Sequence, residues 1–391
     1  MILGHLGSII ASLGQKTLPV VEFPFATITG KRLSNGATWS DTALSKPDLR
    51  FTGTELAHAV IKADFLNRVN PLMPGLAFVL QSHLLVDWQS PTLRLRNGAT
   101  EVLSDFVEKS LSGRLGQGLS ILHAHQEGFA FQGHLSSILV AQGLPIKDSK
   151  GQDLPIADFL IEGGSGVRGL LESKASFRQL TNCPKATKAV LKDALASQVS
   201  PWMGRLNPPA TKAFAVASYV RDDSQAGTEP SVLAFVDPED TPDGGDIQVS
   251  SAELRRENYA AWLTAMGLTD TAIKLLNRTA EGSTQVPFIV FEIAGLEFAF
   301  PWLILDMWDL IPHPHSRRSR QDFLAFGLEV RVLQAIASSI RGDDAPLTEI
   351  APLNETGISN SENYSYSIFP DKTFLGNFDR RRPVRIIEVE L

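Results

Sequence analysis

Cysteine is nearly absent from this chain: of its 391 residues, Cys183 is the single one. One thiol excludes a disulfide framework and a cysteine-rich metal centre, and it fits a reducing compartment. The sequence also lacks a run of about 20 apolar residues, the length that a membrane span needs. The longest candidate, residues 287–308, is interrupted by Glu292, Glu297 and Pro301. The apolar N-terminal stretch has no basic residues of the kind that begin a secretory leader. We therefore expect a cytoplasmic protein.

Positive charge is scarce as well. The chain has 36 Lys and Arg against 43 Asp and Glu, for a net charge of -7. Such a balance does not by itself indicate a nucleic-acid binder, so any phosphate contact must come from local basic clusters. Two clusters stand in the C-terminal part, HPHSRRSR at residues 313–320 and DRRRPVR at residues 379–385. Each is a candidate for phosphate contact, although exposed charge runs often only solvate a surface.

What the chain does contain is ordinary for a folded protein. Its apolar content of 43% and charged content of 20% are typical of a globular protein. The length allows two or three domains, or one enlarged domain with insertions. Turn residues and apolar periodicity then divide the central part into elements. We expect a helix, two strands, a helix and two further strands, at residues 112–127, 157–162, 169–175, 183–199, 212–220 and 231–237. This order predicts an α/β core.

The flanks give weaker patterns. We expect a helix that begins at Thr52 or Thr54 and a helical region over residues 251–282. A hairpin is predicted to turn at residues 294–295, a long helix to cover residues 319–342, and an exposed loop to cover residues 354–365.

The central hairpin, residues 156–177, carries charges where buried strands prefer apolar residues. Side chains alternate along a strand, so Glu172 and Lys174 share a face, and Asp158 shares one with Leu160 and Glu162. The turn GGSG lets the two strands fold together, which brings Asp158 and Glu172 close with Lys174 beside them. Two such carboxylates repel each other unless a cation lies between them, and oxygen ligands suit Mg²⁺ or Mn²⁺. These parts suffice for metal-dependent phosphodiester hydrolysis. A solvated strand edge is the alternative interpretation.

The arrangement resembles the PD-(D/E)xK nuclease superfamily, which has the restriction-endonuclease-like fold. There a helix precedes a hairpin that bears one acid on its first strand and an acid-x-Lys on its second, and a helix and strand follow. Asp158, Glu172 and Lys174 match those positions, and the resemblance covers residues 113–237. The proline expected directly before the first acid is missing here, since Pro155 lies three positions earlier.

The resemblance implies a fold class and a division of the chain. It implies an α/β protein whose restriction-endonuclease-like core, a mixed central sheet flanked by helices, carries extra N- and C-terminal α+β segments. We expect the core at residues 111–240, an N-terminal segment at residues 1–110, and a C-terminal segment at residues 241–391. The flanking segments would select substrate, bind a protein partner or form a homo-oligomer.

The resemblance also implies an activity. It implies a nuclease that hydrolyses DNA, with Mg²⁺ or Mn²⁺ held by Asp158 and Glu172 and with Lys174 beside the attacking water. Prokaryotic nucleases of this kind serve in restriction, phage defence or repair, which is an analogy at the level of the fold. The rivals are a non-catalytic nucleic-acid-binding or assembly subunit that retains the fold, and an interaction protein whose hairpin is structural.

Several other side chains are candidates for supporting roles. Glu162 could replace Asp158 as a ligand, because both lie on one face of their strand. Polar groups of the neighbouring helices and strand ends could reach the metal or the phosphate: Gln117, Glu127, Ser176 and Gln198. His123, His125 and His134 could suggest zinc, but two histidines spaced i, i+2 on a helix point apart.

Overall fold

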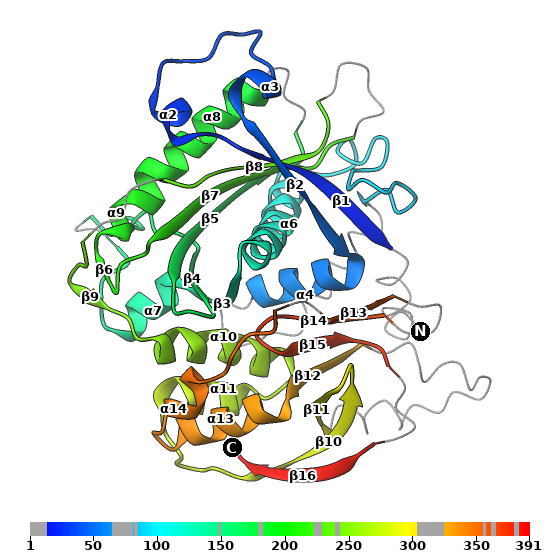
Figure 1. Cartoon of the computed structure of the whole chain (residues 1–391), viewed down its shortest axis with the longest axis vertical. Helices are drawn as coiled ribbons and strands as arrows, with labels where there is room; N and C mark the ends of the chain where they lie inside the picture. The colour runs from blue at the N-terminus through cyan, green and yellow to red at the C-terminus, as the bar shows by residue number, and fades with distance from the viewer. Residues whose placement is uncertain are drawn as a thin grey trace. The chain divides into compact units, whose positions relative to one another are not determined.

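The computed structural model describes residues 14–64, 81, 85–147, 150–178, 183–222, 229–238, 243–302, 324–354, 357–360, 365–378 and 383–391. The chain forms two compact units (Figure 1). The first, here called the mixed-sheet unit, comprises Gln15–Phe51 and Gln81–Ser250. The second, the antiparallel-sheet unit, comprises Met1–Gly14, Thr52–Leu80 and Ser251–Leu391. The predicted core range 111–240 therefore lies wholly within the mixed-sheet unit, whereas the predicted N-terminal segment contributes to both units.

The mixed-sheet unit is built on a seven-stranded sheet with the order β2-β1-β8-β7-β5-β4-β3. The strands are β1 (Gln15–Glu22), β2 (Leu44–Thr52), β3 (Phe129–His134), β4 (Phe159–Gly163), β5 (Arg168–Ser176), β7 (Lys212–Tyr219) and β8 (Val232–Val236). β3, β4 and β5 are antiparallel neighbours, whereas β5 and β7 run parallel. β7 pairs antiparallel with β8, and β8 pairs parallel with β1. The predicted mixed α/β architecture is confirmed.

Helices cover this sheet and connect its strands (Figure 1). They are α2 (Phe25–Thr29), α3 (Trp39–Thr42), α6 (Asp105–Gln126), α7 (Leu135–Ala141), α8 (Cys183–Ala194) and α9 (Ser200–Met203), with the π-helix η2 (Leu195–Val199) between α8 and α9. The short strands β6 (Leu206–Asn207) and β9 (Ile247–Gln248) form a separate pair. The predicted helices at 112–127 and 183–199 are confirmed, the first beginning seven residues earlier and the second ending in the π-helix.

The packing of α6 against β5 depends on a glycine. A Cβ atom at Gly116 would overlap the side chain of Ala175, so only glycine permits this close approach. One turn further on, the Ser120 hydroxyl donates to Ser173 Oγ at 3.0 Å. Ser173 and Ala175 therefore point toward α6. Because side chains alternate along a strand, Glu172 and Lys174 point to the opposite face of the sheet.

The antiparallel-sheet unit has a second seven-stranded sheet, with the order β13-β14-β15-β12-β11-β10-β16. Its strands are β10 (Gln285–Ile293), β11 (Leu296–Pro301), β12 (Ala325–Glu329), β13 (Gly357–Asn360), β14 (Ser365–Ile368), β15 (Thr373–Gly376) and β16 (Arg385–Glu390). Its helices are α4 (Gly53–Ala63), α10 (Ser251–Ala265), α11 (Thr269–Asn277), α13 (Val330–Ile340) and α14 (Ala345–Thr348). Of the two predicted caps, Thr52 and Thr54, the structure has Thr52, whose hydroxyl accepts the Glu55 amide at 3.2 Å. The predicted turn is confirmed too, with positive φ at Ala294 and Gly295.

A buried polar cluster lies inside this unit. The Lys62 ammonium pairs with Asp371 and donates to Asn258 Oδ1 at 2.9 Å. The ring of His58 stacks on Phe369 with 3.7 Å between centroids. Charged groups at such depth need partners, because an unpaired buried charge would cost several kcal/mol. The Lys62–Asp371 pair meets that requirement.

Two predictions for the flanks are wrong. Residues 319–342 do not form one helix, because Ala325–Glu329 form strand β12, which pairs with β11 and β15 before α13 begins. Pairing with two distant strands overrides the local helical pattern. Residues 354–365 were predicted as an exposed loop, yet they contain β13 and the first residue of β14.

The two basic clusters fall mostly outside the described residues. All of residues 313–320 and residues 379–382 lie outside them. Arg385, at the end of the second cluster, donates to both carboxylate oxygens of Glu297, at 3.0 and 2.7 Å. Within the described part of the chain, no helix combines the length and the apolarity that crossing a membrane requires.

The core of the mixed-sheet unit contains a histidine whose ionisation opposes folding. His123 of α6 is 1% exposed and packs against Phe214 and Phe235, with ring centroids 5.7 and 4.5 Å away. Burial lowers its pKa from 6.5 to about 4. Between pH 6.5 and pH 4, His123 therefore binds a proton in the unfolded chain but not in the folded chain. The free energy of unfolding must fall as the pH is lowered through this range.

We predict that the free energy of unfolding drops as the pH is lowered from 6.5 to 4, with His123 contributing up to about 3 kcal/mol of that loss. Urea denaturation at a series of pH values measures it. His123→Phe, a ring of similar size without a titrating group, should remove this part of the slope. An identical pH profile for the variant would contradict the assignment.

Candidate active site on the β4–β5 hairpin

Strand register brings the two predicted acids together. β4 and β5 pair with Phe159 opposite Leu171 and Leu160 opposite Leu170. One residue beyond the last pair, Asp158 faces Glu172. The turn that makes this possible contains Gly166, whose φ of +75° suits glycine. The hairpin predicted from the sequence is thus present, with Asp158 directly before its first strand.

Each carboxylate is held by a backbone amide of the neighbouring strand. The Asp158 amide donates to Glu172 Oε2 at 3.1 Å, and the Ser173 amide donates to Asp158 Oδ2 at 2.9 Å. These reciprocal bonds fix both side chains relative to the backbone. A carboxylate has about four lone-pair sites, so each group keeps acceptor capacity beyond the one amide.

Lys174 completes the group. Its Nζ lies 2.7 Å from Glu172 Oε1 and donates to Gln198 Oε1 at 2.6 Å. Gln198 belongs to η2, and its own amide donates to the carbonyl of Ile156 at 3.4 Å. The indole of Trp202 in α9 donates to the neighbouring carbonyl of Pro155 at 2.8 Å. The helical run that follows β5 is therefore tied to the segment that enters β4, and it holds the lysine between two acceptors.

Burial and repulsion raise the pKa values of the two carboxyl groups. Burial raises the pKa of Asp158 to about 6, against the lowering effects of the Ser173 amide and Lys174. Burial, followed by the charge of Asp158, raises the pKa of Glu172 to about 7, although Lys174 opposes the shift. Glu172 is 1% exposed, whereas the side chain of Lys174 is 37% exposed. The site therefore combines a buried glutamate, a half-buried aspartate and a lysine that solvent can reach.

This arrangement fits a hard divalent cation. Two adjacent carboxylates that resist joint ionisation would be stabilised by a positive ion, and Mg²⁺ is commonly bound by one or two carboxylates with water and phosphate oxygens as its other ligands. The described residues contain no group of three or more His, Cys, Asp or Glu side chains arranged to hold a metal. A dedicated all-protein cage is thus not what the hairpin provides. Asp158 and Glu172 are the residues that could hold an ion.

Glu162 is on the predicted face but at the wrong end of the hairpin. It pairs in register with Arg168, whose Nε lies 3.7 Å from its carboxylate. Four residues along a strand correspond to about 13 Å, so the strand separates Glu162 from Asp158. The carboxylate is fully buried, and its guanidinium partner also donates to the carbonyl of Val249. The structure does not bring Glu162 to Glu172 and Lys174.

The other supporting candidates differ in their placement. Gln198 is joined to Lys174, as described. Ser176 ends β5 on the Lys174 face, and its hydroxyl accepts the Arg178 amide at 3.0 Å, which is a local turn contact. Gln117 is half-buried on α6, on the opposite side of β5, and Glu127 follows the end of that helix, exposed to solvent. His134 packs against Phe159 with centroids 4.6 Å apart.

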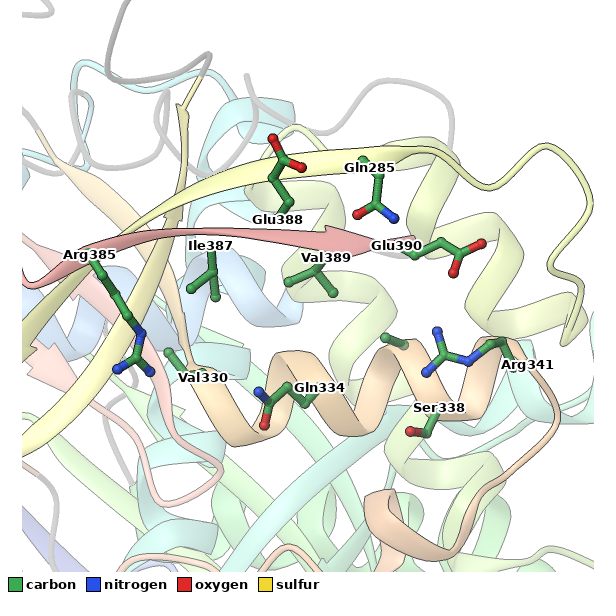
Figure 2. A pocket seen from close by; sticks show the side chains of 11 residues that line it. Gln285, Val330, Gln334, Ser338, Arg341, Arg385, Ile387, Glu388, Val389 and Glu390 are labelled. Atoms are coloured by element: carbon green, nitrogen blue, oxygen red, sulfur yellow. The ribbon is translucent and has the colours of Figure 1, made fainter.

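A second hollow lies in the antiparallel-sheet unit, between α13 and β16. Its volume is about 510 Å³. Figure 2 shows Arg385 near one end and Arg341 near the other, with Glu390 on the Arg341 side. Because charges of both signs line this hollow and Arg385 already binds Glu297, it does not present one charge to a ligand.

Comparisons of the chain with protein-family profiles, with curated proteins and with solved structures found no match.

The raised pKa values make a prediction about stability. An acid whose pKa is higher in the folded state than in the unfolded state lowers the free energy of unfolding at pH values above its unfolded pKa. This loss of stability disappears as the pH falls below that value. In chelator at pH 8, Asp158→Asn should therefore increase the free energy of unfolding by about 1–3 kcal/mol, and the gain should vanish near pH 4. Urea denaturation measures the difference.

Asp153→Asn is the matched control, because the side chain of Asp153 is 84% exposed and only loosely paired with Lys147. It should change stability little at any pH. A loss of stability in Asp158→Asn at pH 8 would show that the carboxylate stabilises the metal-free fold, contrary to the prediction.

Proposed function

We propose that the mixed-sheet unit is a Mg²⁺-dependent nuclease with a restriction-endonuclease-like core of the PD-(D/E)xK type, and that it hydrolyses phosphodiester bonds in DNA. The observation that supports this most is the contact set of Asp158, Glu172 and Lys174 on one face of one hairpin. The three residue types and their order follow the pattern that the sequence resembles.

The order of elements supports the same proposal. α6 precedes the antiparallel strands β3, β4 and β5, and α8 then leads to β7, which runs parallel to β5. Apart from β3 and α7, which stand between α6 and the β4–β5 hairpin, this is the helix, hairpin, helix and strand order of the resemblance. Asp158 lies directly before β4, the first strand of the hairpin, and Glu172 and Lys174 lie on β5, its second strand.

Each residue has a role that its surroundings permit. Asp158 and Glu172 would hold the ion, which when bound supplies a Lewis acid for the phosphate and lowers the pKa of water. Lys174 lies between Glu172 and Gln198, close to the acids and accessible to solvent. From there it can orient the attacking water or balance the negative charge that develops on the phosphate. Gln198 positions the lysine without touching the reacting atoms.

Plasmid nicking tests the proposal. The wild-type protein should cut DNA with Mg²⁺ or Mn²⁺, poorly with Ca²⁺, and not in excess chelator. Lys174→Ala should reduce the cleavage rate by at least about 100-fold, because it removes charge stabilisation at the reacting group, while Mn²⁺ binding by calorimetry stays near wild type. Asp158→Ala and Glu172→Ala should abolish cleavage and also weaken Mn²⁺ binding.

Lys109→Ala is the control for these variants, since Lys109 is an exposed residue of α6, on the far side of β5. It should cut like the wild type. Cleavage at the wild-type rate by all three site variants, or full cleavage in chelator, would refute the nuclease. Absence of cleavage by the wild type under every metal condition would favour a non-catalytic subunit that retains the fold.

Gln198→Ala gives a separate prediction for a positioning residue. Loss of the amide acceptor should lower kcat about tenfold with little change in KM, because the lysine loses its orientation but the substrate contacts remain. A kcat equal to that of the wild type would mean that Gln198 serves the fold alone.

A further inference from the structure

A groove of about 540 Å³ runs along α8 in the mixed-sheet unit. Residues after α2 form one wall and the exposed side of α8 forms the other. The charged side chains that line it are Arg32, Lys185, Lys188, Lys192 and Asp193. Four cations thus face one acid in a chain whose net charge is -7. In contrast to the hollow beside α13, this groove is dominated by one sign of charge.

Within the described part of the chain, no acid neutralises these four cations. Among the described residues, none of them has a carboxylate within ion-pair distance. Lys185 donates to the amide oxygen of Asn35, and Lys188 donates to the carbonyls of Gly30 and Lys31, the latter at 2.6 Å. Elsewhere in this unit lysines do find acids, as Lys212 does at 2.6 Å from Asp237.

Lys188 shows why this charge is unusual. It is 6% exposed, and the bonds to two carbonyls fix its ammonium at the wall formed by the residues after α2. Burial and the charge of Lys192 lower its pKa. An anion from outside the chain would stabilise a cation held at such a place beside further cations.

The spacing of the lysines matches an extended anion. Lys185, Lys188 and Lys192 follow each other at three and four residues, so they share one side of α8 and span about 10 Å of its axis. That length exceeds a single phosphate group. Ala196 of η2 also lines the groove, and Gln198, which holds Lys174, belongs to the same π-helix. One continuous helical run therefore carries both the row of lysines and the contact to the candidate active site.

We infer that this groove binds the phosphodiester backbone of the nucleic acid and leads it toward the β4–β5 hairpin. The inference rests on the proposed function for its ligand class, but the binding itself needs neither the metal nor the reaction. Such a groove would let an acidic protein bind a polyanion, because three of its four cations lie along one helix, α8. Backbone contacts of this kind are independent of base sequence and depend steeply on salt.

The test measures binding in chelator, so that no cleavage intervenes. Fluorescence anisotropy gives the affinity for a labelled 20-base-pair DNA duplex at several KCl concentrations. Lys185→Gln with Lys192→Gln should reduce the slope of log affinity against log salt by about 2, because each lost phosphate contact removes about 0.9. Binding at low salt should weaken at least tenfold. Lys188 is left intact, since its ammonium also holds the opposite wall.

Lys109→Gln with Lys147→Gln is the matched control, because it removes two exposed lysines from other parts of the same unit. Its slope should equal that of the wild type. A slope in the groove variant that is unchanged on both DNA and RNA, or the same reduction in both double variants, would overturn the inference. A thermal unfolding midpoint equal to that of the wild type would show that the variants are folded.

The outcome is separable from that of the cleavage test. If the salt dependence of binding is weaker in the groove variant but neither the wild type nor any variant cuts DNA, the results support nucleic-acid binding in the groove and not the nuclease activity. If cleavage depends on Lys174 but the groove variant binds like the wild type, the nuclease stands and the groove fails. A parallel titration with a 20-nucleotide RNA identifies the nucleic acid: a slope change on RNA alone supports the groove and assigns it to RNA.

Discussion

Two reciprocal hydrogen bonds between neighbouring strands determine the chemistry of the hairpin. Because the Asp158 amide binds Glu172 and the Ser173 amide binds Asp158, neither carboxylate can swing away without breaking strand contacts. Repulsion between the two charges cannot be relieved by movement. It is relieved instead by proton uptake, which is why both pKa values rise, or by a cation. The ion pair with Lys174 offsets this repulsion only in part.

The scaffold around this pair is suited to holding it rigidly. The acids and the lysine stand on or directly beside strands rather than in long loops, and β5 is paired on both sides, with β4 and with β7. α6 closes the opposite face through its contact at Gly116. Groups placed on regular elements with packed neighbours are held more precisely than groups on loops. The exposed edge of the site is therefore its lysine.

Local patterns in the sequence predicted the hairpin but not everything that supports it. Alternation along the strands and the GGSG turn were enough to place Asp158, Glu172 and Lys174 on one face. The pairing of β1 with β8 joins segments about two hundred residues apart, and no local period encodes it. For the same reason the local pattern predicts a helix where the structure has β12. The row of lysines on α8 was visible as an i, i+3, i+7 pattern, but its partner wall at Gly30–Leu33 was not.

The π-helix between α8 and α9 makes the site sensitive to chain length rather than to residue type. Residues 195–199 wind more loosely than the α-helical turns on either side, and Gln198 lies within them. Removal of a single codon from this stretch would turn every later helical residue by about 100° relative to the earlier ones. Gln198 and Trp202 could then no longer both meet the carbonyls at residues 155 and 156. An in-frame deletion that leaves every named site residue in the gene would thus separate the lysine from its support.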